Sequence, residues 1–244
     1  IRQDLANLRD AGSLYGAIIY QKAPIVMRQL EQLIGEEALR DGLRTYLDRH
    51  RFGNATWPDL IAILDDLTPE DLAGWSRVWV TESGRPLVDA TWEAGSLPLR
   101  PRDPVVGRNL NWTQPVGVVL ARGDTIRPVT ASLRDSAATV AIANAPARRP
   151  DLILPGADGV SYGRFLPDSA GVRWLLVRLP SLRSATHRAV AWQGLREAVL
   201  AGHADASSVL RLALVAAPAE PDELVLAQTL GVLRELYWRY LPDA

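Results

Sequence analysis

The stretch from residue 18 to residue 50 reads IIYQKAPIVMRQLEQLIGEEALRDGLRTYLDRH and predicts two consecutive helices. The first is expected at residues 20–34, because a helix tolerates proline in its first turn, where Pro24 lies, and apolar residues then recur at helical spacing. Gly35 ends this helix. The second is expected at residues 36–50, with one buried stripe of side chains along its length. The stripe consists of Leu39, Leu43, Tyr46, Leu47 and His50.

Two more helices are predicted downstream from their start signals. Thr56 and Thr68 are each followed by a proline within two residues and by an acidic residue three positions on, a combination typical of helix N-termini. Gly84 and the proline after Arg85 stop the last of these helices. Three of its side chains share one face: Leu72, Trp75 and Trp79. A helical first domain is therefore expected over residues 1–84.

The pattern of apolar residues then changes twice along the chain. Residues 85–167 hold apolar runs of about five residues separated by proline, glycine, asparagine and aspartate, which predicts a small antiparallel β-sandwich. Four of these runs are residues 88–92, 116–120, 129–133 and 139–143. Residues 168–244 return to helical periodicity and predict stacked, HEAT-like helix pairs. The expected fold class is multidomain α+β, helical at 1–84, a β-sandwich at 85–167 and α-helical at 168–244.

The overall composition restricts the function classes. The chain has 244 residues with 27 basic and 28 acidic side chains, so no positive excess exists to neutralise nucleic acid or an anionic membrane surface. It has no cysteine, which excludes disulfides, thiolate nucleophiles and cysteine-containing zinc sites. No apolar run approaches the roughly 20 residues that span a bilayer. We therefore expect a soluble protein that binds no nucleic acid and has no membrane span.

The chain begins Ile1-Arg2-Gln3, without a methionine or a signal-peptide pattern, and is therefore expected to be a piece of a longer protein. Its basic residues are arginines except Lys22, a bias that GC-rich codon usage explains. We expect a bacterial protein of the cytoplasm or the periplasm, and the choice between these compartments stays open.

Few of the polar residues form a recognisable catalytic or metal-binding motif. The chain has three histidines: His50, His187 and His203. They are far apart and lack the H-x-x-x-H spacing that places two imidazoles on one helix face, so no metal site made by this chain alone is expected. The acidic pairs at 65–66 and 70–71 are interpreted as helix-end acids, and Asp158 as a turn residue. Signatures of serine hydrolases and nucleotide-binding loops are absent.

Tyr20 stands out by its position at the entry of the first helix. On pattern alone it is a packing residue with its hydroxyl at the surface. The surrounding sequence, however, resembles the gluzincin zinc aminopeptidases of the aminopeptidase N type, in which a tyrosine opens a helix in a Tyr-x-Lys-Gly pattern. Tyr20 and Lys22 match this pattern, whereas Ala23 and Pro24 depart from its glycine. The resemblance continues through Gly35, Gly42-Leu43, Tyr46-Leu47, His50, Asn54-Ala55, Asp59-Leu60, Trp79 and Gly84-Arg85-Pro86, and more weakly at residues 159–165.

This resemblance implies a function as well as a fold. The family's tyrosine, matched by Tyr20, donates a hydrogen bond to the oxyanion of the tetrahedral intermediate, opposite a zinc ion. The family's zinc ligands, in an H-E-x-x-H motif and a later glutamate, and its Gly-x-Met-x-Asn amine anchor are not in this sequence. The resemblance thus implies the C-terminal portion of a zinc aminopeptidase, with Tyr20 as its catalytic residue, no bound cofactor of its own and no activity alone. Its partners would be a peptide substrate and the missing N-terminal portion.

Two other interpretations stay open. The same fold could serve as a non-catalytic scaffold or binding module in which Tyr20 is retained for packing, and an intact or degraded H-E-x-x-H motif upstream would discriminate between the two. The C-terminal helices could also bind a partner through Trp174, Trp192 and Trp238, although core packing is the preferred interpretation of these side chains.

Overall fold

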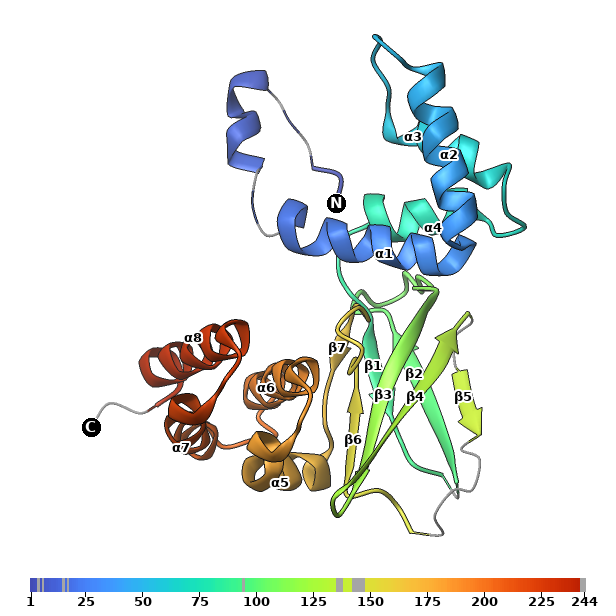
Figure 1. Cartoon of the computed structure of the whole chain (residues 1–244). Coiled ribbons are helices and arrows are strands. Elements are labelled where there is room, and N and C mark those ends of the chain that lie inside the picture. Colours follow the sequence, from blue (N-terminus) through green and yellow to red (C-terminus); the bar gives the residue numbers. More distant parts are fainter. Residues whose placement is uncertain are drawn as a thin grey trace. The chain divides into compact units, whose positions relative to one another are not determined.

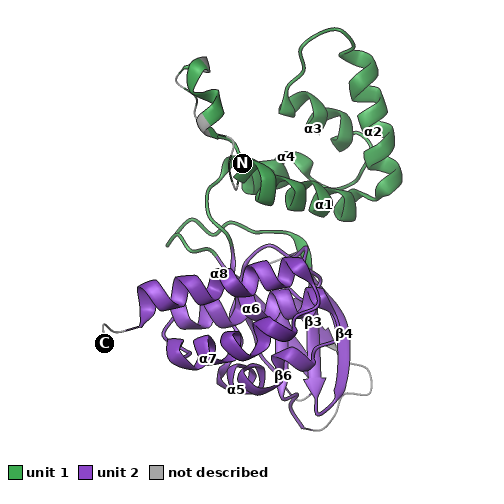
Figure 2. Cartoon of the chain, turned by 60° about the vertical axis from the view of Figure 1, so that its left-hand side comes forward, with its two compact units in different colours: residues 1–85, 103–115 green, residues 86–102, 116–244 purple. Residues whose placement is uncertain are grey.

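The computed structural model describes residues 1–3, 5, 7–14, 16, 18–93, 95–134, 138–141 and 148–241. This part of the chain combines α-helices with two small sheets (Figure 1). It divides into two compact units (Figure 2). Unit 1 consists of residues 1–85 and 103–115, and unit 2 consists of residues 86–102 and 116–244. The prediction of a mixed α+β chain is confirmed.

Unit 1 is helical. Its elements are a 3₁₀ helix at Leu8–Leu14, a π-helical turn at Ile18–Lys22, α1 (Ala23–Ile34), α2 (Glu36–Arg49), α3 (Trp57–Asp65), α4 (Leu72–Ser76) and a second π-helical turn at Arg77–Thr81. Pro24 lies in the first turn of α1, and Gly35, with a φ of 89°, ends it as predicted. The α-helix begins later than expected, because the first π-helical turn occupies its predicted start.

The packing of α2 differs from the predicted stripe. Leu47 is exposed, and the other side chains of the stripe are only half-buried. The buried residue of α2 is Gly42, where an added Cβ would lie 2.3 Å from the Cδ2 atom of Leu64 in α3. Because a missing side chain lets two helices approach closely, α2 packs on α3 through this glycine, and the prediction of a buried stripe is wrong.

The start of α3 follows its sequence signal, whereas the start of α4 does not. The Asp59 carboxylate accepts hydrogen bonds from the Thr56 backbone N–H at 2.8 Å and from the Thr56 hydroxyl at 2.6 Å. α4 begins after Asp71 rather than after Thr68, because Asp71 caps it by accepting a hydrogen bond at 2.8 Å from the N–H three residues on. The predicted apolar face is confirmed, since its three members are buried: Leu72, Trp75 and Trp79.

The loop at residues 103–115 is fastened to the end of this helical region by Arg108. Its guanidinium donates to the Asp103 carboxylate at 2.7 and 2.9 Å and to the Ser83 carbonyl oxygen at 2.9 Å. Only 3% of the Asp103 side chain is exposed, and its carboxylate also accepts two backbone N–H bonds. The hydrogen bonds from Arg108, together with these N–H donors, hold the pKa of Asp103 far below its usual range.

This pair predicts a pH-dependent stability. Since the folded-state pKa of Asp103 lies below its unfolded value of about 3.9, its stabilising contribution is complete above that pH and is lost as the pH falls further. Asp103→Asn removes the charge, so the variant should be less stable than the wild type by about 2 kcal/mol at neutral pH. This difference should shrink steadily below about pH 4. Urea denaturation of both proteins across this range measures it, and a pH-independent difference would contradict the assignment.

The strands lie in unit 2, apart from the first residues of β3. They are β1 (Leu87–Ala90), β2 (Ser96–Arg102), β3 (Gln114–Arg122), β4 (Thr125–Leu133), β5 (Ala138–Ala141), β6 (Leu152–Pro155) and β7 (Arg164–Phe165). One sheet has the order β5-β2-β1-β7 and the other has the order β4-β3-β6. The pairs β1–β2, β2–β5 and β3–β6 are antiparallel, whereas β1 and β7 are parallel, which was not predicted. An apolar core that includes Leu97, Val118 and Leu133 joins the two sheets.

The helices of unit 2 are α5 (Ser169–Arg178), α6 (Ala185–Leu200), α7 (Ala206–Ala216) and α8 (Glu223–Tyr240). Each follows a residue whose side chain accepts a hydrogen bond from a first-turn N–H: Asp168, Ser184, Asp205 and Asp222. α6 and α8 run parallel. The Gln228 side chain donates a hydrogen bond to the Ala189 carbonyl oxygen, and seven residues further along both helices Arg196 donates to Glu235. None of the described helices is long and apolar enough to cross a membrane.

The helices and one sheet of unit 2 share a second apolar core. Val119 of β3 and Leu154 of β6 belong to the same buried cluster as Leu175 of α5 and Trp192 of α6. Gly171 of α5 permits close approach, since an added Cβ there would lie 3.3 Å from a leucine methyl of β6. Strands and helices therefore pack as one unit, and the boundary that the sequence places between sandwich and helices stays a prediction.

Candidate functional site

Tyr20 lies in the π-helical turn Ile18–Lys22, immediately before α1. Its backbone N–H donates to the Gly16 carbonyl oxygen at 3.0 Å. Short π-helical segments are rare and occur frequently at functional sites. Tyr20 is 67% exposed, so it is not the packing residue that pattern alone predicts. Its side chain is accessible to a molecule approaching from solvent.

Lys22 completes the match to the Tyr-x-Lys pattern and ends the same π-helical turn. It is half-buried, and this burial lowers the pKa of its ammonium group, because the charged form loses contact with water. Pro24 follows in the first turn of α1, where its missing N–H is tolerated. The start of α1 therefore accommodates Ala23 and Pro24, which replace the family's glycine. Tyr20 is exposed beside them.

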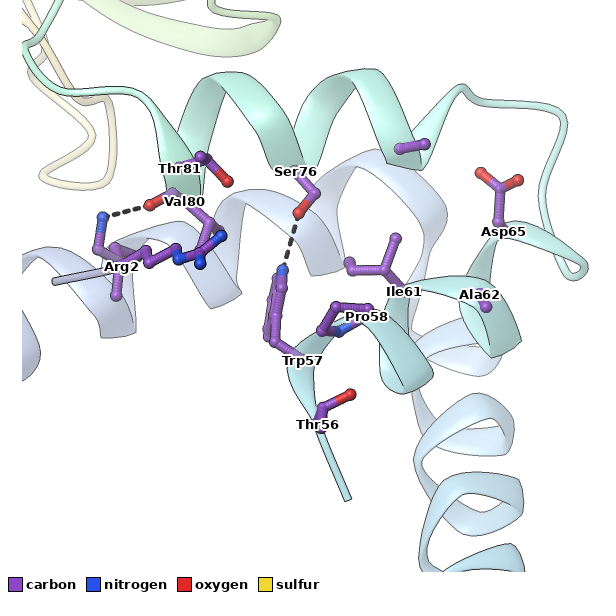
Figure 3. A pocket seen from close by; sticks show the side chains of 12 residues that line it. Arg2, Thr56, Trp57, Pro58, Ile61, Ala62, Asp65, Ser76, Val80 and Thr81 are labelled. Carbon is purple, nitrogen blue, oxygen red and sulfur yellow. Dashed lines mark hydrogen bonds between the residues drawn. The ribbon is translucent and has the colours of Figure 1, made fainter. Parts of the chain in front are cut away.

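A cavity of about 920 Å³ lies in unit 1 (Figure 3). It is lined by the N-terminal segment, α3, α4 and the second π-helical turn. The Trp57 indole N–H donates to the Ser76 hydroxyl at 2.8 Å, and the Arg2 N–H donates to the Val80 carbonyl oxygen at 2.8 Å. The cavity could not be predicted from the sequence, because its walls come from segments far apart in the chain. Tyr20 is not among its lining residues, so the tyrosine and the cavity are separate features.

Within the described part of the chain, no three histidine, aspartate or glutamate side chains gather so that they could hold a metal ion. The histidines lie in different elements, with His50 at the end of α2, His187 in α6 and His203 in the turn after α6. The His50 ring lies beside that of Tyr46, with centroids 5.1 Å apart, and burial lowers the pKa of the His187 imidazole. The described residues therefore do not fit a zinc ion.

Acidic residues at the ends of α3 and α4 accept hydrogen bonds from backbone N–H groups, in agreement with their interpretation as helix-end acids. The Asp65 carboxylate accepts a hydrogen bond from the Leu72 N–H at 2.8 Å, while Asp71 caps α4. Asp158 is a turn residue, also as predicted, and accepts hydrogen bonds from the N–H groups of Val160 and Ser161 at 3.0 and 2.9 Å. Each of these three carboxylates is thus occupied by a helix end or a turn.

Comparisons with known proteins agree with the resemblance seen in the sequence. Residues 1–79 match the Peptidase family M1 domain. Aminopeptidase N of Streptomyces lividans is 26% identical over 215 residues, which cover 79% of this chain and 24% of that protein. Aminopeptidase N of Lactobacillus delbrueckii subsp. lactis is 37% identical over 92 residues, which cover 38% of this chain and 11% of that protein.

A solved structure shows the same fold. The crystal structure of Legionella pneumophila aminopeptidase A in complex with aspartic acid matches with a TM-score of 0.62 at 16% identity, covering 89% of this chain and 26% of that one. The chain thus spans about a quarter or less of the length of these relatives. Taken with the M1 match, these likenesses confirm the resemblance read around Tyr20: the chain is related to the M1 aminopeptidases of the aminopeptidase N type.

Proposed function

We propose that this chain is part of a zinc-dependent aminopeptidase that removes N-terminal residues from peptides, and that Tyr20 stabilises the transition state. Tyr20 is the observation that carries the proposal. It lies inside the segment that matches the M1 domain, begins the Tyr-x-Lys pattern seen in the sequence, and is exposed at a π-helical turn. A phenol exposed at a helix start suits the recognition of a reacting group, because its hydroxyl can reach a substrate that approaches from solvent.

The chemistry of Tyr20 follows from its hydroxyl. When water attacks an amide carbonyl, negative charge develops on the carbonyl oxygen, and a donor aimed at that oxygen lowers the barrier more than it stabilises the substrate. The phenolic O–H of Tyr20 would donate a hydrogen bond to this oxygen. The phenol neither activates the water nor protonates the leaving amine in this scheme, so the remaining chemistry must come from other groups.

The rest of the chain would act as architecture. We assign residues 1–84 to the helical part of a gluzincin catalytic domain that forms one wall of the cleft, residues 85–167 to a β-sandwich, and residues 168–244 to a HEAT-like helical cap. The zinc ion and its H-E-x-x-H ligands would belong to the full-length protein, since the motif is absent from residues 1–244. The chain alone should therefore be inactive, because a phenol without an activated water does not hydrolyse an amide at a useful rate.

The test is steady-state hydrolysis of aminoacyl fluorogenic amides by the full-length protein that contains this chain. Tyr20→Phe, at matched zinc content, should lower kcat by about a hundredfold or more, the usual effect of deleting one oxyanion donor. Tyr46→Phe is the matched control. It also removes one hydroxyl, but that hydroxyl donates to the Thr56 carbonyl oxygen and is predicted to take no part in the reaction. Its kcat should stay within about twofold of the wild type.

The outcomes separate the candidate functions. Equal rates for the wild type and Tyr20→Phe would remove Tyr20 from the mechanism while leaving the aminopeptidase assignment intact. An inactive wild-type protein with a degraded H-E-x-x-H motif upstream would instead favour a non-catalytic scaffold with the same fold.

A further inference from the structure

A groove of about 640 Å³ lies in unit 2 between the parallel helices α6 and α8. Gln193 and Arg196 of α6 line one side of it. Gly231, Arg234 and Trp238 of α8 line the other. We call this the α6–α8 groove; it shares no residue with the cavity of unit 1.

Hydrogen bonds join the two helices that form the α6–α8 groove. The Gln228 side-chain amide donates to the Ala189 carbonyl oxygen at 2.9 Å, and the Arg196 guanidinium donates to Glu235 at 2.5 and 2.8 Å. Gly231 faces open space, since an added Cβ there would find nothing within 4 Å. The walls are therefore fixed before any molecule binds, which reduces the entropy that binding must overcome.

The groove carries a net positive charge, because three arginines and one glutamate are among its lining residues. The bidentate pair with Glu235 neutralises Arg196. Arg234 and Arg239, which also line the groove, are both exposed. Among the described residues no carboxylate forms an ion pair with either guanidinium, and Glu235 attracts Arg239 without pairing with it. Arginine is suited to carboxylate recognition, because its planar fork donates two parallel hydrogen bonds.

An aromatic surface lies beside these charges. Trp238 is 76% exposed, and Tyr237 packs edge-on against it with ring centroids 5.0 Å apart. Tryptophan, tyrosine and arginine are the residues most enriched where binding energy concentrates in protein interfaces. The groove thus combines the exposed guanidinium groups of Arg234 and Arg239 with an exposed indole.

We propose that the α6–α8 groove binds an acidic peptide segment of a partner protein. Its carboxylates would pair with Arg234 and Arg239, and an apolar side chain would pack on Trp238. Charge complementarity selects an acidic partner. The length of the groove selects a peptide over a small anion, because the lining residues from Gln228 to Arg239 span roughly 16 Å of helix. That distance is covered by about five residues of extended chain.

The test uses fluorescence anisotropy of a dye-labelled hexapeptide with four acidic side chains and one phenylalanine, acetylated and amidated at its ends. The full chain should bind it. The double variant Arg234→Glu with Arg239→Glu should weaken binding by about tenfold or more, and Trp238→Ala by about tenfold. Gly231→Leu fills the groove without changing its charge and should also weaken binding. Arg173→Glu on α5, which is exposed and outside the groove, is the matched control and should leave the affinity unchanged.

Several results would overturn the proposal. One is equal binding of a hexapeptide in which lysines replace the acids, since no charge selection would then exist. Another is full displacement of the peptide by an equal concentration of acetate or inorganic phosphate, which would make the groove a small-anion site. A third is concentration-dependent self-association that Trp238→Ala abolishes, which would assign the groove to a second copy of this chain. None of these readouts depends on peptidase activity, so the proposal stands or falls separately from the role of Tyr20.

Discussion

Replacing Glu220 with alanine should lower the free energy of unfolding of unit 2 by about 3 to 5 kcal/mol. Its carboxylate accepts hydrogen bonds from the Arg188 guanidinium at 2.6 and 2.8 Å, and both side chains are at least nine-tenths buried. Arg188 also donates to the carbonyl oxygens of Leu182 and Arg183. Without Glu220 the guanidinium would remain in the core without its bidentate partner, because these carbonyls hold it in place.

A second ion pair provides the control. Arg196 and Glu235 form a bidentate pair of similar geometry, but their side chains are 30% and 20% exposed. Water can replace the lost partner there, so Glu235→Ala should cost about 1 kcal/mol. Urea denaturation followed by circular dichroism compares the two variants. A cost for Glu220→Ala no larger than that for Glu235→Ala would show that burial does not control the strength of these pairs.

Replacing Trp192 with alanine should cost about 3 to 5 kcal/mol, whereas Trp238→Ala should change stability by about 0.5 kcal/mol or less. Trp192 is 1% exposed and belongs to the core shared by α6 and the sheet, so its removal leaves a large cavity. Trp238 is exposed on the parallel helix α8. The two variants delete the same side chain from neighbouring helices, so the comparison isolates burial.

The three tryptophans for which the sequence favours core packing differ in burial. Core packing is confirmed for Trp192, and Trp174 is half-buried against the same core. For Trp238 the prediction of core packing is wrong, because its side chain is 76% exposed on α8. Thermal denaturation of the two alanine variants tests this division. Equal losses of stability would mean that the exposed face of α8 is covered in solution.

The features that could be predicted from sequence are those set by neighbouring residues. Pro24 and Gly35 mark the first turn and the end of α1, and the Thr56 and Asp59 pair marks the start of α3. Each signal acts over a few residues of backbone, so no knowledge of the rest of the fold is needed. The apolar face along α4 and the π-helical turn that follows it was predicted for the same reason.

The features that could not be predicted depend on contacts between distant segments. Gly42 packs against Leu64, and this contact overrides the apolar stripe of α2. β2 contains Pro98 and Pro101, which usually indicate an edge strand, yet it lies between β1 and β5. The parallel pairing of β1 with β7 joins residues that are far apart in the chain. Periodicity within a single run carries no information on these neighbours.

The candidate site shows the same limit. Pattern alone makes Tyr20 a packing residue, and only the resemblance to a family gives it a chemical role. The π-helical turn that holds it exposed has no recognised sequence signal, since residues 20–34 fit one regular helical period. The α6–α8 groove could not be predicted either, because its lining residues come from two helices that are separated in the sequence.

The apolar core shared by the strands and helices of unit 2 has an evolutionary consequence. Side chains of β3 and β6 fill the same interior as side chains of α5 and α6, with Gly171 close to β6. A larger residue on one side must be accommodated by a smaller residue or a shift on the other. The sequence pattern changes from strand-like to helical between these segments, yet substitutions in the strands and in the helices should be coupled. The strands and helices should therefore evolve together.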